Sequence, residues 1–213
     1  MDVADYRDRF PILAETTYLI NHSLAAMPVA AEDRVVEYTR MWRTRGIRAW
    51  GEGWWDLPLT VGDQVGRIVG APPGTICMHQ NVTIAVAVIL SCFRPPPPRN
   101  RIVYLEGEFP SVRYLLQAQP DAEVEVLPDL DALLEAIDER TLLVPISHVL
   151  FKTAELQDVA AVQRRAEEVG AHVILDAYQS AGAVPLDVRR LGVAFATGLR
   201  AVRTRRWIWG KSG

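Results

Sequence analysis

Hydrophobic and polar positions along the chain follow two alternating periodicities. Short apolar runs rich in Val, Ile and Leu recur between longer segments in which apolar residues return every three or four positions. A run of the first kind predicts a buried strand, and a segment of the second kind predicts an amphipathic helix. Strands are predicted at 17–20, 76–78, 101–105, 123–127, 141–146 and 172–175, and helices at 30–43, 54–69, 82–93, 111–119, 130–137 and 156–169.

The order of these elements predicts the fold class. From residue 76 on, strands and helices alternate. Such alternation is typical of a mostly parallel sheet with helices on both faces. We therefore expect an α/β fold.

The charges divide the chain into two parts, residues 1–198 and an atypical tail, 199–213. All 26 acids lie at or before Asp187, whereas the tail contains five bases and no acid. Such a basic terminus is also typical of an arm that binds nucleic acid. Trp207 and Trp209 are unusual in a solvated arm, and no recognition motif accompanies them, so we expect no nucleic-acid partner.

Composition places the chain among soluble globular proteins, with 49% hydrophobic and 23% charged residues. The longest apolar stretch, residues 84–92, is too short to cross a membrane, and the N-terminus lacks a signal-peptide pattern. We expect a cytoplasmic protein without a membrane partner. The two cysteines and four histidines show no ligand spacing, so reduced cysteines and no metal site are expected.

The segment 173–182 is an apolar strand that ends on a carboxylate, Asp176, and passes into small and polar residues. A buried carboxylate without a partner costs several kcal/mol, so a cationic group is expected near it. A loop acid that caps the next helix is an equally good interpretation of these residues alone.

This segment resembles the cofactor strand of pyridoxal 5′-phosphate (PLP) enzymes of fold type I, class V aminotransferase group, and most closely that of kynureninases. The resemblance implies a large PLP-binding domain as the fold and PLP as the cofactor. It also implies that Asp176 pairs with the protonated pyridine nitrogen, which strengthens the ring as an electron sink. In class V aminotransferases and desulfurases a glutamine three residues later approaches the phenolic oxygen, which implies that role for Gln179.

Polar residues 79–83 stand where a strand turns into a helix. The free amides and the dipole of a helix N-terminus suit a phosphate. Ordinary capping by Asn81 explains the same pattern. Kynureninases have a similar turn that holds the cofactor phosphate, and the resemblance therefore implies phosphate binding by the Val82 amide and by the amide and hydroxyl of Thr83.

Phe109 follows a predicted strand and precedes a helix that begins with proline. An aromatic ring at such a position can lie on a flat heterocycle, although a core position is an alternative. The family has a similar Phe-Pro-Ser segment whose aromatic ring stacks on the pyridine, which implies this role for Phe109. The kynureninase pattern continues with Asp, where this chain has Val112.

Three further residues are assigned to the substrate side by the resemblance. His148 lies in the turn 147–153, which approaches cofactor and substrate in the family, and Asn21 and Ser23 lie in a segment similar to the family's entry loop. Kynureninases tend to have Asn and Tyr where this chain has Leu150 and Phe151. That difference fits other class V members better.

The resemblance stops after Gly198. In the family the strand that resembles 193–197 leads to the lysine that forms the Schiff base, and an ungapped alignment from Asp176 places that lysine at about Val202. A Schiff base needs an amine, which Val lacks. We expect a chain truncated before the catalytic lysine, through a shifted reading frame, an internal deletion or natural truncation. We also expect the tail from Leu199 to pack poorly.

These observations lead to three functional hypotheses. The first is a kynureninase-like, PLP-dependent hydrolase that cleaves a carbon–carbon bond of an amino-acid substrate and is inactive as written. The second is a class V aminotransferase or cysteine desulfurase-like enzyme, and the third is a non-catalytic fragment with weak or absent PLP binding. The resemblance implies a homodimer for the full-length protein.

Overall fold

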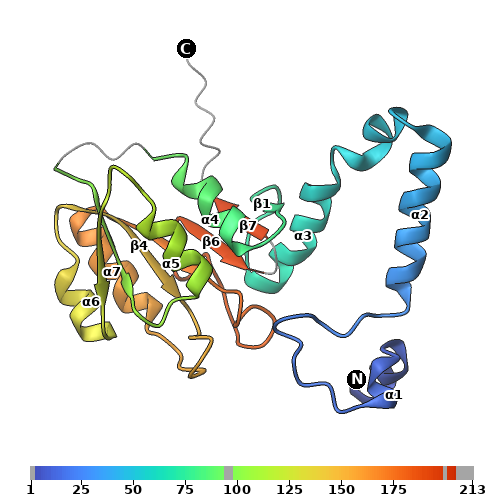
Figure 1. The fold of residues 1–213 in the computed structure, drawn as a ribbon, viewed down its shortest axis with the longest axis horizontal. Coiled ribbons are helices and arrows are strands. Elements are labelled where there is room, and N and C mark those ends of the chain that lie inside the picture. The colour runs from blue at the N-terminus through green and yellow to red at the C-terminus, as the bar shows by residue number, and fades with distance from the viewer. Residues whose placement is uncertain (1–2, 94–97, 199–200, 205–213) are drawn as a thin grey trace. The chain divides into compact units, whose positions relative to one another are not determined.

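The computed structural model describes residues 3–93, 98–198 and 201–204 (Figure 1). Contacts divide the chain into two compact units, Met1–Leu57 and Pro58–Gly213. The predicted site residues are distributed over both units, so each unit is described by itself.

The first unit is helical. It contains η1 (Val3–Arg9), α1 (Ile12–Glu15), α2 (Ala30–Arg45) and a π-turn, η2 (Trp50–Trp54). The predicted strand at 17–20 is wrong, because these residues have no regular secondary structure and Leu19 is 82% exposed. A strand needs a neighbour to bond its backbone, and the described part of this unit provides none. The helix expected at 54–69 begins later, as α3 (Leu57–Val69), because Gly53 with φ 131° breaks the helical path.

The second unit is built on a seven-stranded sheet with the order β1-β7-β6-β5-β4-β2-β3. Neighbouring strands from β6 to β3 are parallel, and β7 runs antiparallel to both β6 and β1. The predicted α/β class is confirmed. The strands are β1 (Ile76–Met78), β2 (Arg101–Leu105), β3 (Glu123–Leu127), β4 (Thr141–Ser147), β5 (His172–Asp176), β6 (Phe195–Gly198) and β7 (Ala201–Thr204).

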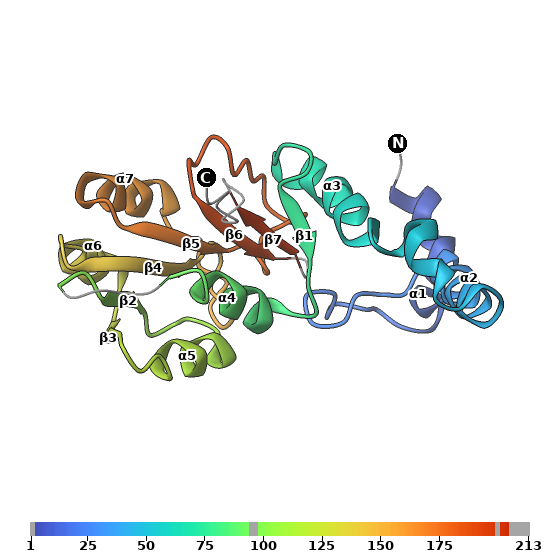
Figure 2. The same cartoon turned by 90° about the horizontal axis from the view of Figure 1, so that it is seen from above.

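Helices cover both faces of this sheet, as predicted. Figure 2 shows α4 (Val82–Leu90) and α5 (Pro110–Gln117) on one face and α7 (Val159–Val169) on the other. One buried cluster joins α4 and α5 to strand residues such as Tyr104 and Ile174, and a second joins α3, α6 (Leu130–Ala136) and α7 to residues such as Val144 and Leu175. Because successive strand residues alternate between faces, each strand contributes to both clusters.

Strand β7 is the described part of the tail. Residues 201–204 pair with β6 on one side and with β1 on the other, where the sequence predicted no strand. The expectation that the tail from Leu199 packs poorly stays a prediction. Backbone hydrogen bonds build such a strand without an apolar pattern in its sequence. Gly198 precedes the reversal with φ 155°, and a Cβ there would lie 3.0 Å from the carbonyl carbon of Ala177. Residues 199–200 and 205–213 lie outside the described part.

The described residues contain neither a helix that could span a membrane nor a group of side chains arranged to bind a metal ion. No helix among them is long and apolar enough to span a membrane. No group of three or more His, Cys, Asp or Glu side chains in the described ranges is arranged to hold a metal ion.

Candidate functional site

The carboxyl ends of β2, β4 and β5 lie together at one edge of the sheet. Ser147, the last residue of β4, is the register partner of Asp176, the last residue of β5. Ligands of open α/β sheets lie outside such strand ends. The residues that follow these strands are therefore the ones to examine for a site.

Asp176 is only 8% exposed, and its Oδ1 accepts the Tyr178 N–H at 2.8 Å. Burial raises the pKa of its carboxyl group to about 6. None of the ion pairs between described residues includes Asp176. Alternation along β5 places it on the face of Ile174, which is the face covered by α4 and α5. A carboxylate held in this way is suited to a cationic ligand atom on that face.

A second buried acid, Glu108, lies beside it and was missed by the sequence analysis. Its Oε1 accepts the Ser147 N–H at 2.7 Å, and its Oε2 lies 2.5 Å from the Ser147 hydroxyl. Burial raises the Glu108 pKa to about 7; the two Ser147 bonds oppose this increase and the charge of Asp176 adds to it. Glu108 lies three residues beyond the end of β2, so the apolar strand does not end on it, and only its neighbour Phe109 carries a signal in the sequence.

The N-termini of α4 and α5 meet at this edge. The hydroxyl groups of Thr83 and Ser111 are 2.7 Å apart. Asn81 caps α4 by accepting the Ile84 N–H at 2.9 Å, so the capping interpretation holds. Since the cap uses the third amide of the helix, the amides of Val82 and Thr83 remain available. Ser111 was not predicted, because only the contact between the helices connects it to Thr83.

Phe109 is the N-cap residue of α5 and is 38% exposed, so the alternative of a core position does not hold. Its ring makes an edge contact with Phe151, with 5.2 Å between the ring centroids. Leu150 packs closely over Gly107, where a Cβ would lie 3.1 Å from its Cδ1. The aromatic residue is therefore held by apolar neighbours while part of its ring stays accessible.

His148 and Gln179 also lie at this edge. The backbone N–H of His148 donates to the Asp176 carbonyl oxygen at 2.8 Å. Its Nδ1 is buried without a partner among the described residues, and burial lowers the pKa of the imidazole. Gln179 is half-buried in the turn that follows Asp176. An unpartnered buried nitrogen next to this backbone suits a ligand that supplies the missing hydrogen bond.

Asn21 and Ser23 belong to the first unit. The Asn21 Oδ1 accepts the Ala26 N–H at 2.9 Å, and the Ser23 N–H donates to the Ile20 carbonyl oxygen at 3.0 Å. These bonds shape a local turn. The assignment of the two residues to the substrate side stays a prediction.

The edge combines three chemical features. Two helix N-termini with paired hydroxyls suit an anion, a partly exposed ring suits a flat heterocycle, and a buried carboxylate suits a protonated ring nitrogen. A chain of contacts connects the three features. Thr83 contacts Ser111 on α5, the helix that Phe109 caps. Glu108, which precedes Phe109, is bonded to Ser147, and Ser147 pairs with Asp176 across the sheet. A phosphorylated pyridine derivative fits this set of groups.

A register row continues this edge across the sheet. Ser147 pairs with Asp176, Asp176 with Thr197, Thr197 with position 202, and position 202 with Cys77. The position at which the alignment expects a lysine thus lies in the same row as Asp176, two strands away. With strands about 4.8 Å apart, the separation is about 10 Å.

A family model described as aminotransferase class-V matches residues 17–198. The chain belongs to this family. It is a family of PLP-dependent proteins of fold type I, so both the fold and the family predicted from the sequence are confirmed. The match ends at Gly198, which is also the last residue of β6.

Curated relatives with similar sequences are kynureninases. Kynureninase of Burkholderia pseudomallei (strain 1106a) is 30% identical over 198 residues, which cover 87% of this chain and 48% of the relative. Kynureninase of Pseudomonas fluorescens is 30% identical over 208 residues, or 92% of this chain and 50% of the relative. The chain therefore spans about half the length of the curated relatives it matches.

Solved structures with a similar fold include a cystine C-S lyase and a cysteine desulfurase. The cystine C-S lyase C-DES, in complex with its reaction product cysteine persulfide, has a TM-score of 0.81 at 21% identity, covering 92% of this chain and 59% of that structure. The cysteine desulfurase CsdA of Escherichia coli has a TM-score of 0.73 at 23% identity, covering 96% and 58%. At this identity the likeness supports the fold alone.

Proposed function

We propose that this chain is the cofactor-binding part of a kynureninase-like, PLP-dependent hydrolase, cytoplasmic and acting on an amino acid by carbon–carbon bond cleavage. The observation that carries the cofactor part is the run of contacts from Thr83 to Asp176 along one sheet edge. PLP, when bound, supplies an electron sink for bonds at the substrate's α-carbon. The kynureninase relatives, at 30% identity, support the choice of reaction.

Asp176 and Phe109 are proposed to hold the pyridine ring. The Asp176 carboxylate would accept a hydrogen bond from the protonated ring nitrogen, whose charge would compensate a carboxylate that burial otherwise penalises. The accessible part of the Phe109 ring would stack on the heterocycle. Gln179, in the turn after Asp176, is assigned to the phenolic oxygen.

The phosphate is proposed to bind between α4 and α5. The amides of Val82 and Thr83 lack intrahelical acceptors, as in any first helical turn. The hydroxyls of Thr83 and Ser111, 2.7 Å apart, donate from both helices. Two helix dipoles that end at one point add favourable potential for a dianion.

The substrate side is proposed to include His148, Asn21 and Ser23. His148 is the best supported of the three, because its buried Nδ1 has no partner among the described residues and its backbone is bonded to Asp176. An amino-acid substrate follows from the family. We further propose that the full-length protein forms a homodimer, as the resemblance implies.

Pyridoxamine 5′-phosphate tests the cofactor site, because it carries the ring and phosphate but needs no lysine. We expect saturable binding by fluorescence titration, weaker by about tenfold or more in Asp176→Asn and in the double variant Thr83→Ala/Ser111→Ala. Asp121→Asn and Ser91→Ala, which change exposed residues outside the site, serve as controls. Equal affinity in all variants contradicts the site.

A class V aminotransferase or desulfurase is the alternative enzyme. Gln179 fits this group, and Leu150 and Phe151 replace the polar residues that kynureninases tend to have. The two reactions can be distinguished by offering kynurenine and cysteine separately to a chain that holds its cofactor covalently. Mass spectrometry then identifies which substrate is converted and into which products.

The chain as written is proposed to be catalytically inactive, because no lysine occupies the aligned position 202. That position lies in the register row of Asp176, so Val202→Lys is the variant to make. We expect it to retain PLP covalently after borohydride reduction, with the added mass mapped to position 202. Arg203→Lys, one residue further along β7, is the matched control. Covalent retention by the unmodified chain at another lysine contradicts the proposal.

A further inference from the structure

Two carboxyl groups are buried at the C-terminal edge of the sheet, and the proposed cofactor site uses one of them. Asp176 is assigned to the ring nitrogen, whereas Glu108, only 2% exposed, has no part in that assignment. Ser147 connects the two. It donates its N–H to Glu108 at 2.7 Å and is the register partner of Asp176.

The surrounding charged groups do not neutralise this pair. Glu106 on the same turn, Asp129 at the start of α6 and Lys152 in the loop after β4 are exposed. The Arg113 guanidinium on α5 donates to the backbone carbonyl oxygen of Glu106 at 2.9 Å. His148 is mainly neutral at pH 7, because burial lowers its pKa. The ion pairs between described residues include neither buried carboxyl group.

Ionising two neighbouring buried carboxyl groups without a cation is costly, so the charge of one disfavours the charge of the other. Burial raises the pKa of both groups, to about 7 for Glu108 and about 6 for Asp176, and the charge of Asp176 adds to the increase at Glu108.

The contact with Ser147 is compatible with a protonated Glu108. A protonated Oε2 donates to the Ser147 hydroxyl oxygen across the observed 2.5 Å, and the Ser147 N–H still donates to Oε1. Both hydrogen bonds thus exist whether or not Glu108 carries the proton. Because Glu108 directly precedes Phe109, they tie the turn that carries the aromatic ring to the end of β4.

We propose that Glu108 is a positioning residue of this site, which holds the Phe109 turn against β4 through Ser147 and, as a neutral acid, leaves the negative charge of the pair to Asp176. The inference rests on the proposed cofactor site, because the positions that it fixes are those of Phe109 and Asp176. Its tests on the ligand-free chain do not depend on cofactor binding.

The first test follows the carboxyl carbons of Asp and Glu by ¹³C NMR as the pH is changed. We expect one Glu signal, absent in Glu108→Gln, to titrate near pH 7 and one Asp signal, absent in Asp176→Asn, near pH 6. Asp176→Asn should lower the Glu108 midpoint, whereas Glu108→Gln should leave the Asp176 midpoint almost unchanged. A Glu108 midpoint near the ordinary 4.3, or one that Asp176→Asn does not move, overturns the proposal.

The second test measures hydrogen exchange of the Ser147 amide. We expect Glu108→Ala to accelerate exchange by at least about tenfold, because the amide loses its buried hydrogen-bond acceptor. Glu108→Gln should retain the protection, since its carbonyl oxygen still accepts the N–H, and Glu106→Ala on the same turn is the matched control. If Glu108→Ala does not fold, Glu108→Gln decides. Loss of protection in Glu108→Gln, or equal loss in the control, contradicts the positioning role.

Binding of pyridoxamine 5′-phosphate separates this inference from the proposed function. If the unmodified chain does not bind it, while the titration and the exchange behave as expected, the cofactor assignment fails and the Glu108–Ser147 interaction stands. If the chain binds it, Glu108→Ala should weaken binding by about tenfold and Glu108→Gln should restore most of the affinity. Equal affinity in Glu108→Ala and the unmodified chain overturns the positioning role.

Discussion

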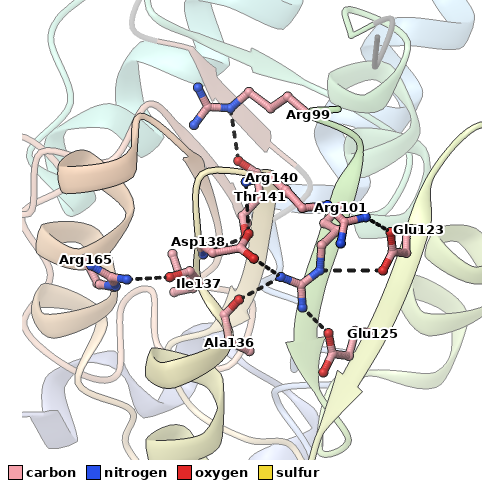
Figure 3. A network of polar contacts seen from close by, with 10 residues as sticks. All are labelled: Arg99, Arg101, Glu123, Glu125, Ala136, Ile137, Asp138, Arg140, Thr141 and Arg165. Atoms are coloured by element: carbon pink, nitrogen blue, oxygen red, sulfur yellow. Dashed lines mark hydrogen bonds and ion pairs between the residues drawn. The ribbon is translucent and has the colours of Figure 1, made fainter. Parts of the chain in front are cut away.

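The two ends of the parallel strands differ in whether their charged side chains are paired. At the amino ends of β2, β3 and β4, Arg101 is buried and forms ion pairs with Asp138 at 2.7 Å, with Glu125 and, at 3.9 Å, with Glu123 (Figure 3). Its guanidinium also donates to the Ala136 carbonyl oxygen at 3.1 Å. At the carboxyl ends, two acids are buried, and no cation is paired with either among the described residues.

The pKa directions express this difference. Burial raises the pKa of Asp138, but the Arg140 N–H and the charge of Arg101 outweigh it, so the net shift is downward. The pKa values of Glu108 and Asp176 are raised, since burial dominates there. At the amino ends the chain's own arginine neutralises the acids and stabilises the fold. At the carboxyl ends the two buried acids retain an electrostatic cost, which a cationic ligand can offset.

The largest expected effect is on the pH dependence of stability. A raised carboxyl pKa means that the folded state binds more protons than the unfolded state, so the free energy of unfolding falls as pH rises. The window runs from the ordinary pKa values of 4.5 and 3.8 to about 7 for Glu108 and about 6 for Asp176. Across its window each group lowers the free energy of unfolding by about 3 kcal/mol. Urea unfolding from pH 3 to 8 measures this fall.

Asp138 changes the free energy of unfolding with pH in the opposite direction. Its lowered pKa gives stability that is present above about pH 4 and lost as pH falls through the folded value. Stability should therefore be greatest near pH 4–5, and the double variant Glu108→Gln/Asp176→Asn should flatten the decline above that range. A free energy of unfolding that stays constant between pH 4.5 and 8 contradicts the contrast between the two edges.

The next largest effect is expected from Arg101→Ala. It leaves three carboxylates without their common partner and a polar carbonyl of Ala136 without its donor. Removing one member of a buried pair costs about 3–5 kcal/mol, and because the acids here are about half exposed we expect about 2–3 kcal/mol. Urea unfolding at pH 7 measures the loss. Affinity for pyridoxamine 5′-phosphate should change less than twofold, since Arg101 lies at the other end of the strands.

The sequence predicts the buried strands best. In β2 all five residues are buried, and its continuous apolar run is a strong signal for a parallel sheet. The segment 17–20 has a similar pattern but no neighbour to pair with, and local sequence does not reveal that. The opposite error occurs at β7, where pairing with two neighbours makes a strand of residues 201–204 without a hydrophobic pattern.

The sequence predicts those residues of the candidate site that a local pattern identifies one at a time. Asp176 stands out as an acid at the end of an apolar strand, and the structure places it at the carboxyl edge with Phe109 and Thr83. Ser111 becomes visible only through its contact with Thr83, which joins two helices 28 residues apart. Glu108 lacks the signal of Asp176, because it lies three residues beyond the end of β2, and its partner Ser147 is 39 residues away, beyond any local pattern.

Ser147→Ala is expected to lower the free energy of unfolding moderately. The variant removes the hydroxyl contact with Glu108 Oε2 and keeps the N–H bond to Oε1. Because both Ser147 bonds lower the Glu108 pKa, losing one should raise it further. We expect a loss of about 1–2 kcal/mol at pH 8, where Glu108 is ionised, and a smaller loss at pH 5. Equal losses at both pH values would show that the hydroxyl contributes packing and not stabilisation of charge.

The smallest effect is expected from Arg140→Ala, at the edge that already has its own cation. Arg140 pairs with Glu123, and the two side chains are 51% and 50% exposed. Exposed ion pairs contribute about 0–1 kcal/mol and are screened by salt. The Arg140 backbone N–H, which donates to Asp138 at 2.9 Å, is unaffected by the substitution.

We therefore expect a loss below about 0.5 kcal/mol for Arg140→Ala that disappears in 0.5 M NaCl, roughly the concentration at which the screening length falls well below 10 Å. The loss in Arg101→Ala should persist there, because its guanidinium is shielded from solvent. If Arg140→Ala costs as much as Arg101→Ala and the double variant costs no more than either, the two arginines act as one network through Glu123. The amino edge would then depend on one acid that two arginines share, whereas the carboxyl edge buries two acids with no paired cation among the described residues.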